Sequence, residues 1–177
     1  MANVQHRLSV AVLAETAVIK VKGRANAALS VQFKSLAAEL RDTGRKNLVV
    51  DLGECEMMDS TFLGVLAGLV ANVAPGSPQE SRLGVRLLNT CPRVMELLEN
   101  LGVDQLFKFV KGPPIPGDLA PATSVEEAPV SKEAMSRTCL EAHQLLMTLN
   151  PDNVPKFKDV AQFLAEDLQK VSKGDSK

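Results

Sequence analysis

The stretch NLVVDLGECEMMDSTFLGVL, residues 47–66, joins a strand pattern to a helix pattern through a polar turn. Residues 47–52 are almost continuously apolar, which is typical of a central strand covered on both faces. From residue 60 onward, apolar residues recur at helical spacing. A buried strand followed at once by an amphipathic helix predicts an α/β fold with a sheet at its centre.

The alternation of strands and helices continues on both sides of this stretch. Two segments with alternating apolar and polar residues precede it, and the turn Ala14-Glu15-Thr16 between them predicts a hairpin. Pro92 opens the last helix of this region. The predicted strands are 7–13, 17–22, 47–52, 83–88 and 106–110, and the predicted helices are 29–43, 60–74 and 92–101. This order, β-β-α-β-α-β-α-β, predicts a mixed central sheet with helices packed against it.

A Pro-rich stretch divides the chain. Residues 112–130 contain five prolines and two glycines, which predicts a linker without regular elements. Beyond it, two helical patterns flank the break at 150–153, so we expect an antiparallel helical hairpin. The expected organisation is a domain at 1–111, a linker at 112–130 and a two-helix segment at 131–173.

Composition excludes several classes of function. Aromatic residues make up only 3% of the chain and the formal net charge is −1, so we expect no binding of nucleic acid or of a membrane. The three cysteines and two histidines are scattered and match no metal-ligand spacing. The chain also has no phosphate-binding Gly loop and no plausible pair of catalytic carboxylates. We therefore expect no cofactor, no metal and no enzyme activity.

The N-terminal residues contain no apolar run that would serve as a signal peptide, and the run 62–74 is too short to span a bilayer, which needs about 20 residues. We therefore expect a cytoplasmic protein. Within that run, Gly64 and Gly68 form a GxxxG pattern. In a soluble segment, this pattern is expected to let the helix approach the sheet closely.

The candidate functional residues lie in the turn that opens the second helix. Asp59, Ser60 and Thr61 occupy the helix start, where unpaired amides and the helix dipole favour an anion. Asp59 is the expected cap. A phosphate on Ser60 would find amide donors nearby, although Asp59 would repel it. The alternative is that these side chains are ordinary helix caps.

Five segments, in the right order, resemble STAS domains, a family named for sulfate transporters and anti-sigma-factor antagonists. The turn Asp59-Ser60-Thr61 resembles the family's phosphorylation motif, in which the Ser directly after the Asp is modified. The other four segments are Val21 to Arg24, Val49 to Leu52, Asn89 to Val94 and Leu101 to Phe107.

The resemblance implies a partner-switching regulator of transcription. In this family, the antagonist binds a serine kinase that is also an anti-sigma factor, and thereby releases the sigma factor. The kinase then phosphorylates the antagonist, and a phosphatase reverses the modification. On this chain the phosphorylated residue would be Ser60, with Thr61 as the second candidate.

The resemblance also implies a partner-binding surface, formed by Asp59, Thr61, Phe62, Arg24, Asn26 and Asn89. At the position of Phe62 the family often has Gly. Two interpretations of Phe62 stay open, namely a core residue that continues the apolar stripe and an exposed partner contact.

Two further alternatives stay open. The chain could be a phosphorylation-independent STAS scaffold or an accessory subunit of a transport ATPase complex. The C-terminal helices could dock on the same chain or form a homodimer, because two helices alone make a marginal core.

Overall fold

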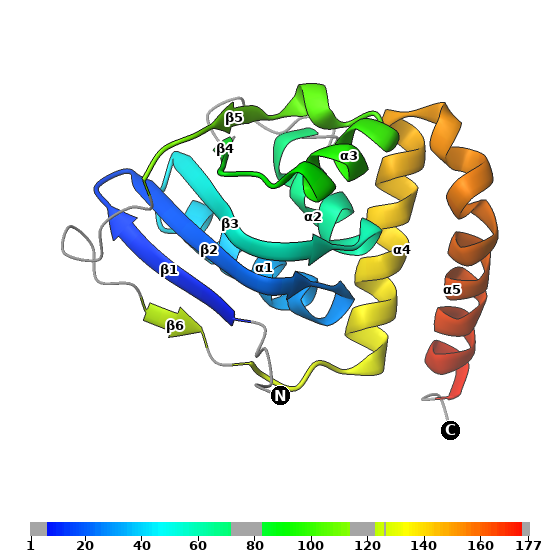
Figure 1. The fold of residues 1–177 in the computed structure, drawn as a ribbon. Coiled ribbons are helices and arrows are strands. Elements are labelled where there is room, and N and C mark those ends of the chain that lie inside the picture. Colours follow the sequence, from blue (N-terminus) through cyan, green and yellow to red (C-terminus); the bar gives the residue numbers. More distant parts are fainter. Residues whose placement is uncertain (1–6, 72–82, 114–122, 126, 175–177) are drawn as a thin grey trace, which may run out of the picture.

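The computed structural model describes residues 7–71, 83–113, 123–125 and 127–174. Its centre is a six-stranded mixed sheet with the order β5-β4-β3-β2-β1-β6 (Figure 1). Strand β1 pairs antiparallel with β2 and β6, and the remaining neighbours are parallel. The strands are β1 (Arg7–Leu13), β2 (Thr16–Ala25), β3 (Asn47–Met58), β4 (Gly84–Leu88), β5 (Lys108–Val110) and β6 (Thr123–Val125). The predicted α/β fold with a mixed sheet is confirmed.

One strand of this sheet was not predicted. Thr123–Val125 lies within the Pro-rich stretch and pairs with Leu8–Val10 of β1. The prediction that residues 112–130 contain no regular element is therefore wrong. Three residues without a recognisable alternation suffice here because the open edge of β1 supplies unpaired backbone donors and acceptors.

The helices of the first region pack on one face of the sheet (Figure 1). They are α1 (Ala27–Asp42), α2 (Ser60–Ala71) and α3 (Pro92–Asn100), followed by the 3-10 turn η2 (Asp104–Leu106). The expected end of α2 near residue 74 lies outside the described residues. On the opposite face, Val49 joins only a small cluster around Ala11 and Val18. The expectation that β3 is covered on both faces is thus wrong for the described elements.

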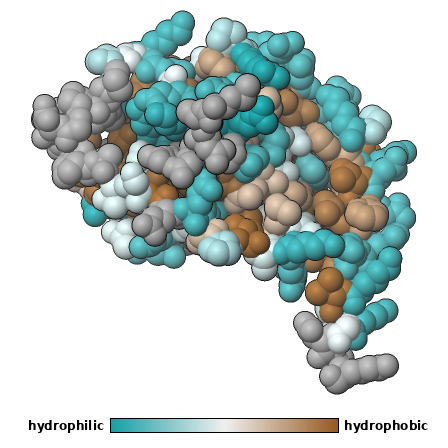
Figure 2. All heavy atoms as spheres, turned by 60° about the horizontal axis from the view of Figure 1, so that its bottom comes forward, coloured by the Kyte–Doolittle hydropathy of each residue, from teal (hydrophilic) through white to brown (hydrophobic). Residues whose placement is uncertain are grey.

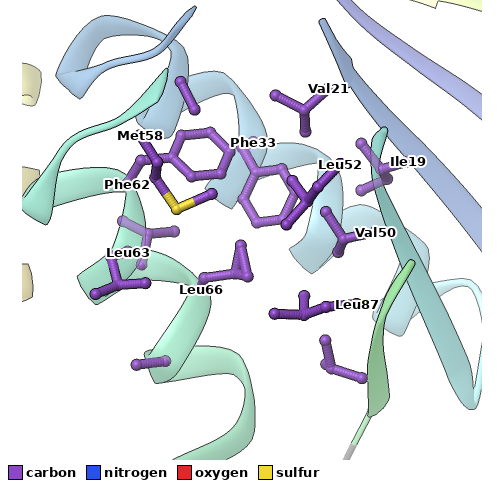
Figure 3. Packing of buried hydrophobic residues seen from close by; sticks show 14 of the residues in the cluster. Ile19, Val21, Phe33, Val50, Leu52, Met58, Phe62, Leu63, Leu66 and Leu87 are labelled. Atoms are coloured by element: carbon purple, nitrogen blue, oxygen red, sulfur yellow. The ribbon is translucent and has the colours of Figure 1, made fainter. Parts of the chain in front are cut away.

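The core is centred on two phenylalanines. Phe33 of α1 and Phe62 of α2 lie with ring centroids 4.8 Å apart, and both are fully buried. Figure 3 shows Phe33 facing Val50 and Leu52 of the sheet, with Phe62 on the other side of Phe33, next to Met58. The strand side chains alternate, so one face of each strand supplies aliphatic partners for these rings.

The C-terminal helices form a hairpin that docks on the rest of the chain. Helix α4 (Lys132–Leu149), the 3-10 turn η3 (Pro151–Asn153) and α5 (Val154–Gly174) follow one another, and α4 and α5 run antiparallel (Figure 1). Ala142 and Leu146 of α4 belong to the main hydrophobic core. The predicted hairpin is confirmed, and the structure shows that it docks on its own chain.

Helix α5 packs against α4 through one side and presents the other side to solvent. Figure 2 shows mainly hydrophilic side chains on the outer surface of this part, interrupted by hydrophobic ones. The exposed large apolar residues of α5 are Val154, Val160, Phe163 and Val171. No helix in the described part of the chain is long and apolar enough to cross a membrane.

Replacement of Phe62 tests the packing of the core. Phe62→Ala leaves a cavity between α2 and the sheet, and we expect it to lower the free energy of unfolding by about 3–5 kcal/mol, measured by chemical denaturation. Phe163→Ala is the matched control, because the Phe163 side chain is exposed and should cost little. Equal effects of the two substitutions would contradict the packing described here.

Candidate functional site

The turn between β3 and α2 is fixed by backbone pairing and by a side-chain cap. The amide of Asp59 donates to the carbonyl of Ala25, at 3.0 Å, where β2 and β3 end side by side. The carboxylate of Asp59 accepts a hydrogen bond from the amide of Phe62, at 2.8 Å. Asp59 is therefore the N-cap of α2, as the sequence predicted. This bond leaves the hydroxyl of Ser60 available for another partner.

The end of β2 brings two more predicted residues to the same edge of the sheet. Asn26 follows β2 and caps α1, because its side-chain oxygen accepts from the amide of Leu29 at 2.9 Å. Arg24 is exposed and pairs in register with Met57, two residues before Asp59. Arg24 and Asn26 therefore lie close in the fold to the turn that carries Ser60.

The hydroxyl of Ser60 contacts a residue that the sequence analysis did not select. Ser60 Oγ lies 3.0 Å from Nε2 of His143, on α4. The imidazole of His143 stacks on Phe157 of α5, with ring centroids 4.7 Å apart and an interplanar angle of 4°. Ser60 itself is half-buried, whereas His143 is only 7% exposed. The hairpin is thus connected directly to the start of α2.

The electrostatics of this pair are set by burial. Desolvation lowers the pKa of His143, and the nearby carboxylate of Asp59 opposes that shift. Desolvation likewise raises the pKa of Asp59, against its backbone hydrogen bonds and the charge of His143. Nδ1 of His143 is buried without a hydrogen-bond partner. A neutral imidazole is therefore the favoured form in the docked state.

Two predicted residues beside Ser60 are buried. Thr61 is 5% exposed, and its hydroxyl lies 3.4 Å from Sγ of Cys139 on α4. Phe62 is fully buried in the core. The inclusion of Phe62 among the partner-contact residues is therefore wrong, because the ring continues the apolar stripe of α2 into the sheet. Modification of Thr61 would require α4 to move.

Asn89 serves a different part of the fold. It adopts a φ of 55°, and its side chain exchanges hydrogen bonds with the backbone of Gly112, at 2.9 and 3.2 Å. Asn89 also adjoins Gly53 of β3. Its contacts hold the segment after β5 and do not involve Ser60.

The GxxxG pattern of α2 accommodates a helix. A Cβ added at Gly64 would lie 2.6 Å from the Cβ of Ala142 and 2.8 Å from its carbonyl oxygen. At Gly68, an added Cβ would lie 3.3 Å from the end of Leu145. The expectation that these glycines let α2 approach the sheet closely is wrong, because they let α4 approach α2 instead.

The sequence did contain part of the signal for His143. His143 lies on the same helical face as Cys139 and Leu146, so periodicity places it on the inner side of α4. Periodicity cannot say which surface that inner side covers. Ser60 and His143 are 83 positions apart in the sequence, so their contact depends on the tertiary arrangement.

The described residues contain no cluster of three or more His, Cys, Asp or Glu side chains that could hold a metal ion. The described cysteines are free thiols, and burial raises the pKa of Cys55 to about 11. The chemistry that the site does offer is that of a hydroxyl at a helix N-terminus, between a capping carboxylate and a buried imidazole.

Comparisons with known proteins agree with this fold. A family model described as "Mlab, STAS domain" matches residues 8–111. No curated protein sequence matches the chain.

Solved structures with a similar arrangement include three anti-sigma-factor antagonist structures. Unphosphorylated SpoIIAA is 16% identical, with a TM-score of 0.49, over 60% of this chain and 88% of that one. An antagonist from Mycobacterium paratuberculosis is 19% identical, with a TM-score of 0.49, over 64% and 91%. Phosphorylated SpoIIAA from Bacillus is 16% identical, with a TM-score of 0.45, over 58% and 89%.

The close approach of α4 to α2 can be tested at the two glycines. Gly64→Ala places a methyl group against the backbone of α4, and we expect it to cost about 1–3 kcal/mol of stability by overpacking, measured by chemical denaturation. Gly68→Ala is the control, because the flexible end of Leu145 can move aside and alanine favours the helix. Stability in Gly64→Ala equal to that of Gly68→Ala would contradict this contact.

The burial of His143 predicts a dependence of stability on pH. Its pKa in the folded state lies below the ordinary 6.5, so the unfolded chain binds the proton more readily. Stability from this residue is present above pH 6.5 and is lost as pH falls from there through the folded pKa.

The test compares the free energy of unfolding of the wild type and of His143→Gln between pH 8 and the acid range. Asp59 is retained in both proteins, so the difference reports the titration of His143 together with its electrostatic coupling to Asp59. We expect the wild type to lose more stability on acidification, and parallel pH profiles would disprove the burial effect.

Proposed function

Because the chain belongs to the STAS domain family, we propose that it is a regulator that binds partner proteins through the surface around Ser60 and exchanges them when Ser60 is phosphorylated. The partners proposed are a serine kinase that is also an anti-sigma factor, from which a sigma factor is released, and a phosphatase that resets the switch. The protein would then act by binding, without enzyme chemistry or a cofactor of its own.

The observation that carries this proposal is the division of roles at the start of α2. Asp59 supplies the helix cap, so the hydroxyl of Ser60 is not needed for it. The side-chain oxygen of a residue that serves only as a cap would accept hydrogen bonds from the helix amides. Ser60 is instead half-buried at the helix N-terminus, where a phosphate would meet a favourable dipole.

A phosphate at this position would change the surface of the STAS domain and leave the arrangement of its sheet as it is. It adds a charge of about −1.5 to −2 and three acceptor oxygens. The neighbouring carboxylate of Asp59, together with the backbone around it, is already arranged by the ends of β2 and β3. A partner that fits the unmodified surface would lose contact, because the new charge would be desolvated in the interface.

A second candidate function is a phosphorylation-independent scaffold or an accessory subunit of a transport ATPase complex. Two observations favour it. The family model carries the description "Mlab", and the hydroxyl of Ser60 is already engaged by His143. Under this alternative the Ser60–His143 contact would be permanent, and the surface would bind one partner throughout.

The phosphorylation state of Ser60 in the protein's own cells separates the two functions. We expect protein isolated from those cells to carry phosphate on the peptide with Ser60, detected by mass spectrometry. A Ser60→Ala variant should remain bound to its kinase in the presence of ATP, whereas wild type should be released. Binding is measured by affinity capture with a quantitative assay of the recovered kinase.

Ser124→Ala is the matched control, since Ser124 is exposed on the edge strand β6. It should behave as wild type. An unmodified Ser60 under all growth conditions, with equal retention of partners by wild type and Ser60→Ala, would support the scaffold and contradict partner switching.

A further inference from the structure

The hairpin lies on the surface through which a partner would reach Ser60. Helix α4 runs along α2, and the contacts advance together on both helices (Figure 1). Cys139 meets Thr61, Ala142 meets Gly64, and the end of Leu145 lies near Gly68. The segment from Cys139 to His143 therefore covers the first turns of α2.

His143 is the residue that joins this cover to the hydroxyl. Its Nε2 lies 3.0 Å from Ser60 Oγ, and its ring is fixed by the stack on Phe157. Because the imidazole is 7% exposed and held by a second helix, it cannot turn away without disturbing both α4 and α5. The state of the Ser60 side chain is thus coupled to the position of the hairpin.

A phosphate on Ser60 would compete with the docked helix for the space around the hydroxyl, which His143 Nε2 already contacts at 3.0 Å. The helices are at contact distance at Gly64, where even a methyl group would lie 2.6 Å from Ala142. Thr61, directly after Ser60, is already buried against Cys139. The space for three phosphate oxygens has to come from a movement of α4.

The helix dipole and the nearby Arg24 would favour a phosphate on Ser60, but they do not provide space for it beside α4. Asp59, directly before Ser60, would repel a phosphate when ionised, although burial raises the pKa of its carboxyl group. Helix α5 contributes the uncharged ring of Phe157, and on α4 Glu141 is paired with Lys34 of α1. Protonated His143 would attract the phosphate, but burial disfavours that form.

The far end of the hairpin is held independently of Ser60. Asn153 Nδ2 donates to the carbonyl of Leu101 at 2.9 Å, and Lys156 Nζ donates to the carbonyl of Asn100 at 2.9 Å. These bonds tie η3 and the start of α5 to the end of α3. Movement of α4 away from Ser60 would leave this attachment in place as a pivot.

We propose that α4 is an intramolecular competitor for the partner-binding surface around Ser60, that His143 is the positioning residue that holds it there, and that phosphorylation of Ser60 lifts it from α2. In the modification, the Oγ–H bond of Ser60 breaks and an Oγ–P bond forms to the γ-phosphoryl group of a nucleoside triphosphate. The bond between the γ-phosphorus and the bridging oxygen breaks, the nucleoside diphosphate leaves, and the proton passes to solvent. That a kinase supplies the phosphate rests on the proposed function, whereas the effect of the phosphate on α4 does not depend on it.

The coupling is reciprocal. If phosphate weakens the docking of α4 by a given factor, docking of α4 weakens the equilibrium for phosphate at Ser60 by the same factor. The docked hairpin thus makes phosphorylation of Ser60 less favourable. A partner that binds at the start of α2 has to displace the hairpin.

The test installs phosphoserine at position 60 of the full chain during synthesis, by suppression of a stop codon, so that no kinase is needed. Hydrogen exchange of α4 peptides is then followed by mass spectrometry. We expect exchange over residues 136–149 to be at least about tenfold faster than in the unmodified protein, with β2 and β3 unchanged. Phosphoserine at Ser124, on the exposed edge strand, is the control and should leave α4 protected.

Equal or stronger protection of α4 in the phosphorylated protein would overturn the proposal, and so would fast exchange throughout β2 and β3, which means global unfolding. A second pair of variants gives an independent measurement. Ser60→Asp adds a charge that its near-isostere Ser60→Asn lacks, so α4 should exchange faster in Ser60→Asp. Identical exchange in this pair would also count against release by charge.

A disulfide lock identifies the moving element. In Thr61→Cys, the new thiol replaces a hydroxyl that lies 3.4 Å from Cys139 Sγ, so oxidation should join α2 to α4. The oxidised phosphoserine protein should keep α4 protected, and reduction should restore fast exchange. The double variant Thr61→Cys with Cys139→Ala cannot lock. Fast exchange of α4 in the locked protein would contradict the assignment of α4 as the released segment.

The two proposals fail separately. Absence of phosphate on Ser60 in cells would remove the proposed partner switch, even if installed phosphate released α4. If installed phosphate does not release α4, the proposal that α4 is displaced by phosphorylation is wrong, even if Ser60 is phosphorylated in cells.

Discussion

The contact between α2 and α4 at Gly64 is the constraint on which the arrangement of the site depends. With no side chain at Gly64, the two helices approach until their backbones touch, and Ala142 fills the space. This approach brings Cys139 to Thr61 and His143 to Ser60, one helical turn away. The hairpin is therefore part of the site at the start of α2, because the same contact that buries its apolar stripe also places an imidazole on a serine hydroxyl.

The sequence predicted the framework well where a local pattern carried the information. Continuous apolar residues at 47–52, the stripe of α2 and the cap at Asp59 each depend on neighbours within a few residues, and all appear in the structure. The resemblance of five segments to STAS domains also predicted the family and the candidate site, which hydrophobic periodicity alone does not indicate. For Phe62, the helical spacing correctly predicted a buried core position. The alternative prediction, an exposed partner contact, was wrong.

The rest required tertiary information. Strand β6 forms because the edge of β1 is open, and nothing in Thr123–Val125 itself indicates a strand. The role of Gly64 depends on which surface approaches α2, and the sequence cannot distinguish a sheet from a helix. In the sequence, His143 is one of several residues on the inner face of an amphipathic helix. Its contact with Ser60 becomes apparent only from the packing of α4 against α2. Local sequence patterns therefore could not predict the contacts of Gly64 and His143 with their partners on the neighbouring helix.

In the proposed switch, the chemical state of Ser60 decides whether α4 lies on α2. The most direct measurement is the distance between spin labels at Lys22, exposed on β2, and Lys170, exposed near the end of α5 that lies far from its attachment to α3, in protein with its native cysteines replaced by alanine. Double electron–electron resonance then compares unmodified protein with protein that carries phosphoserine at position 60. We expect one distance population in the unmodified protein and a displaced or broadened one after phosphorylation. Superimposable distance distributions would contradict the proposed switch.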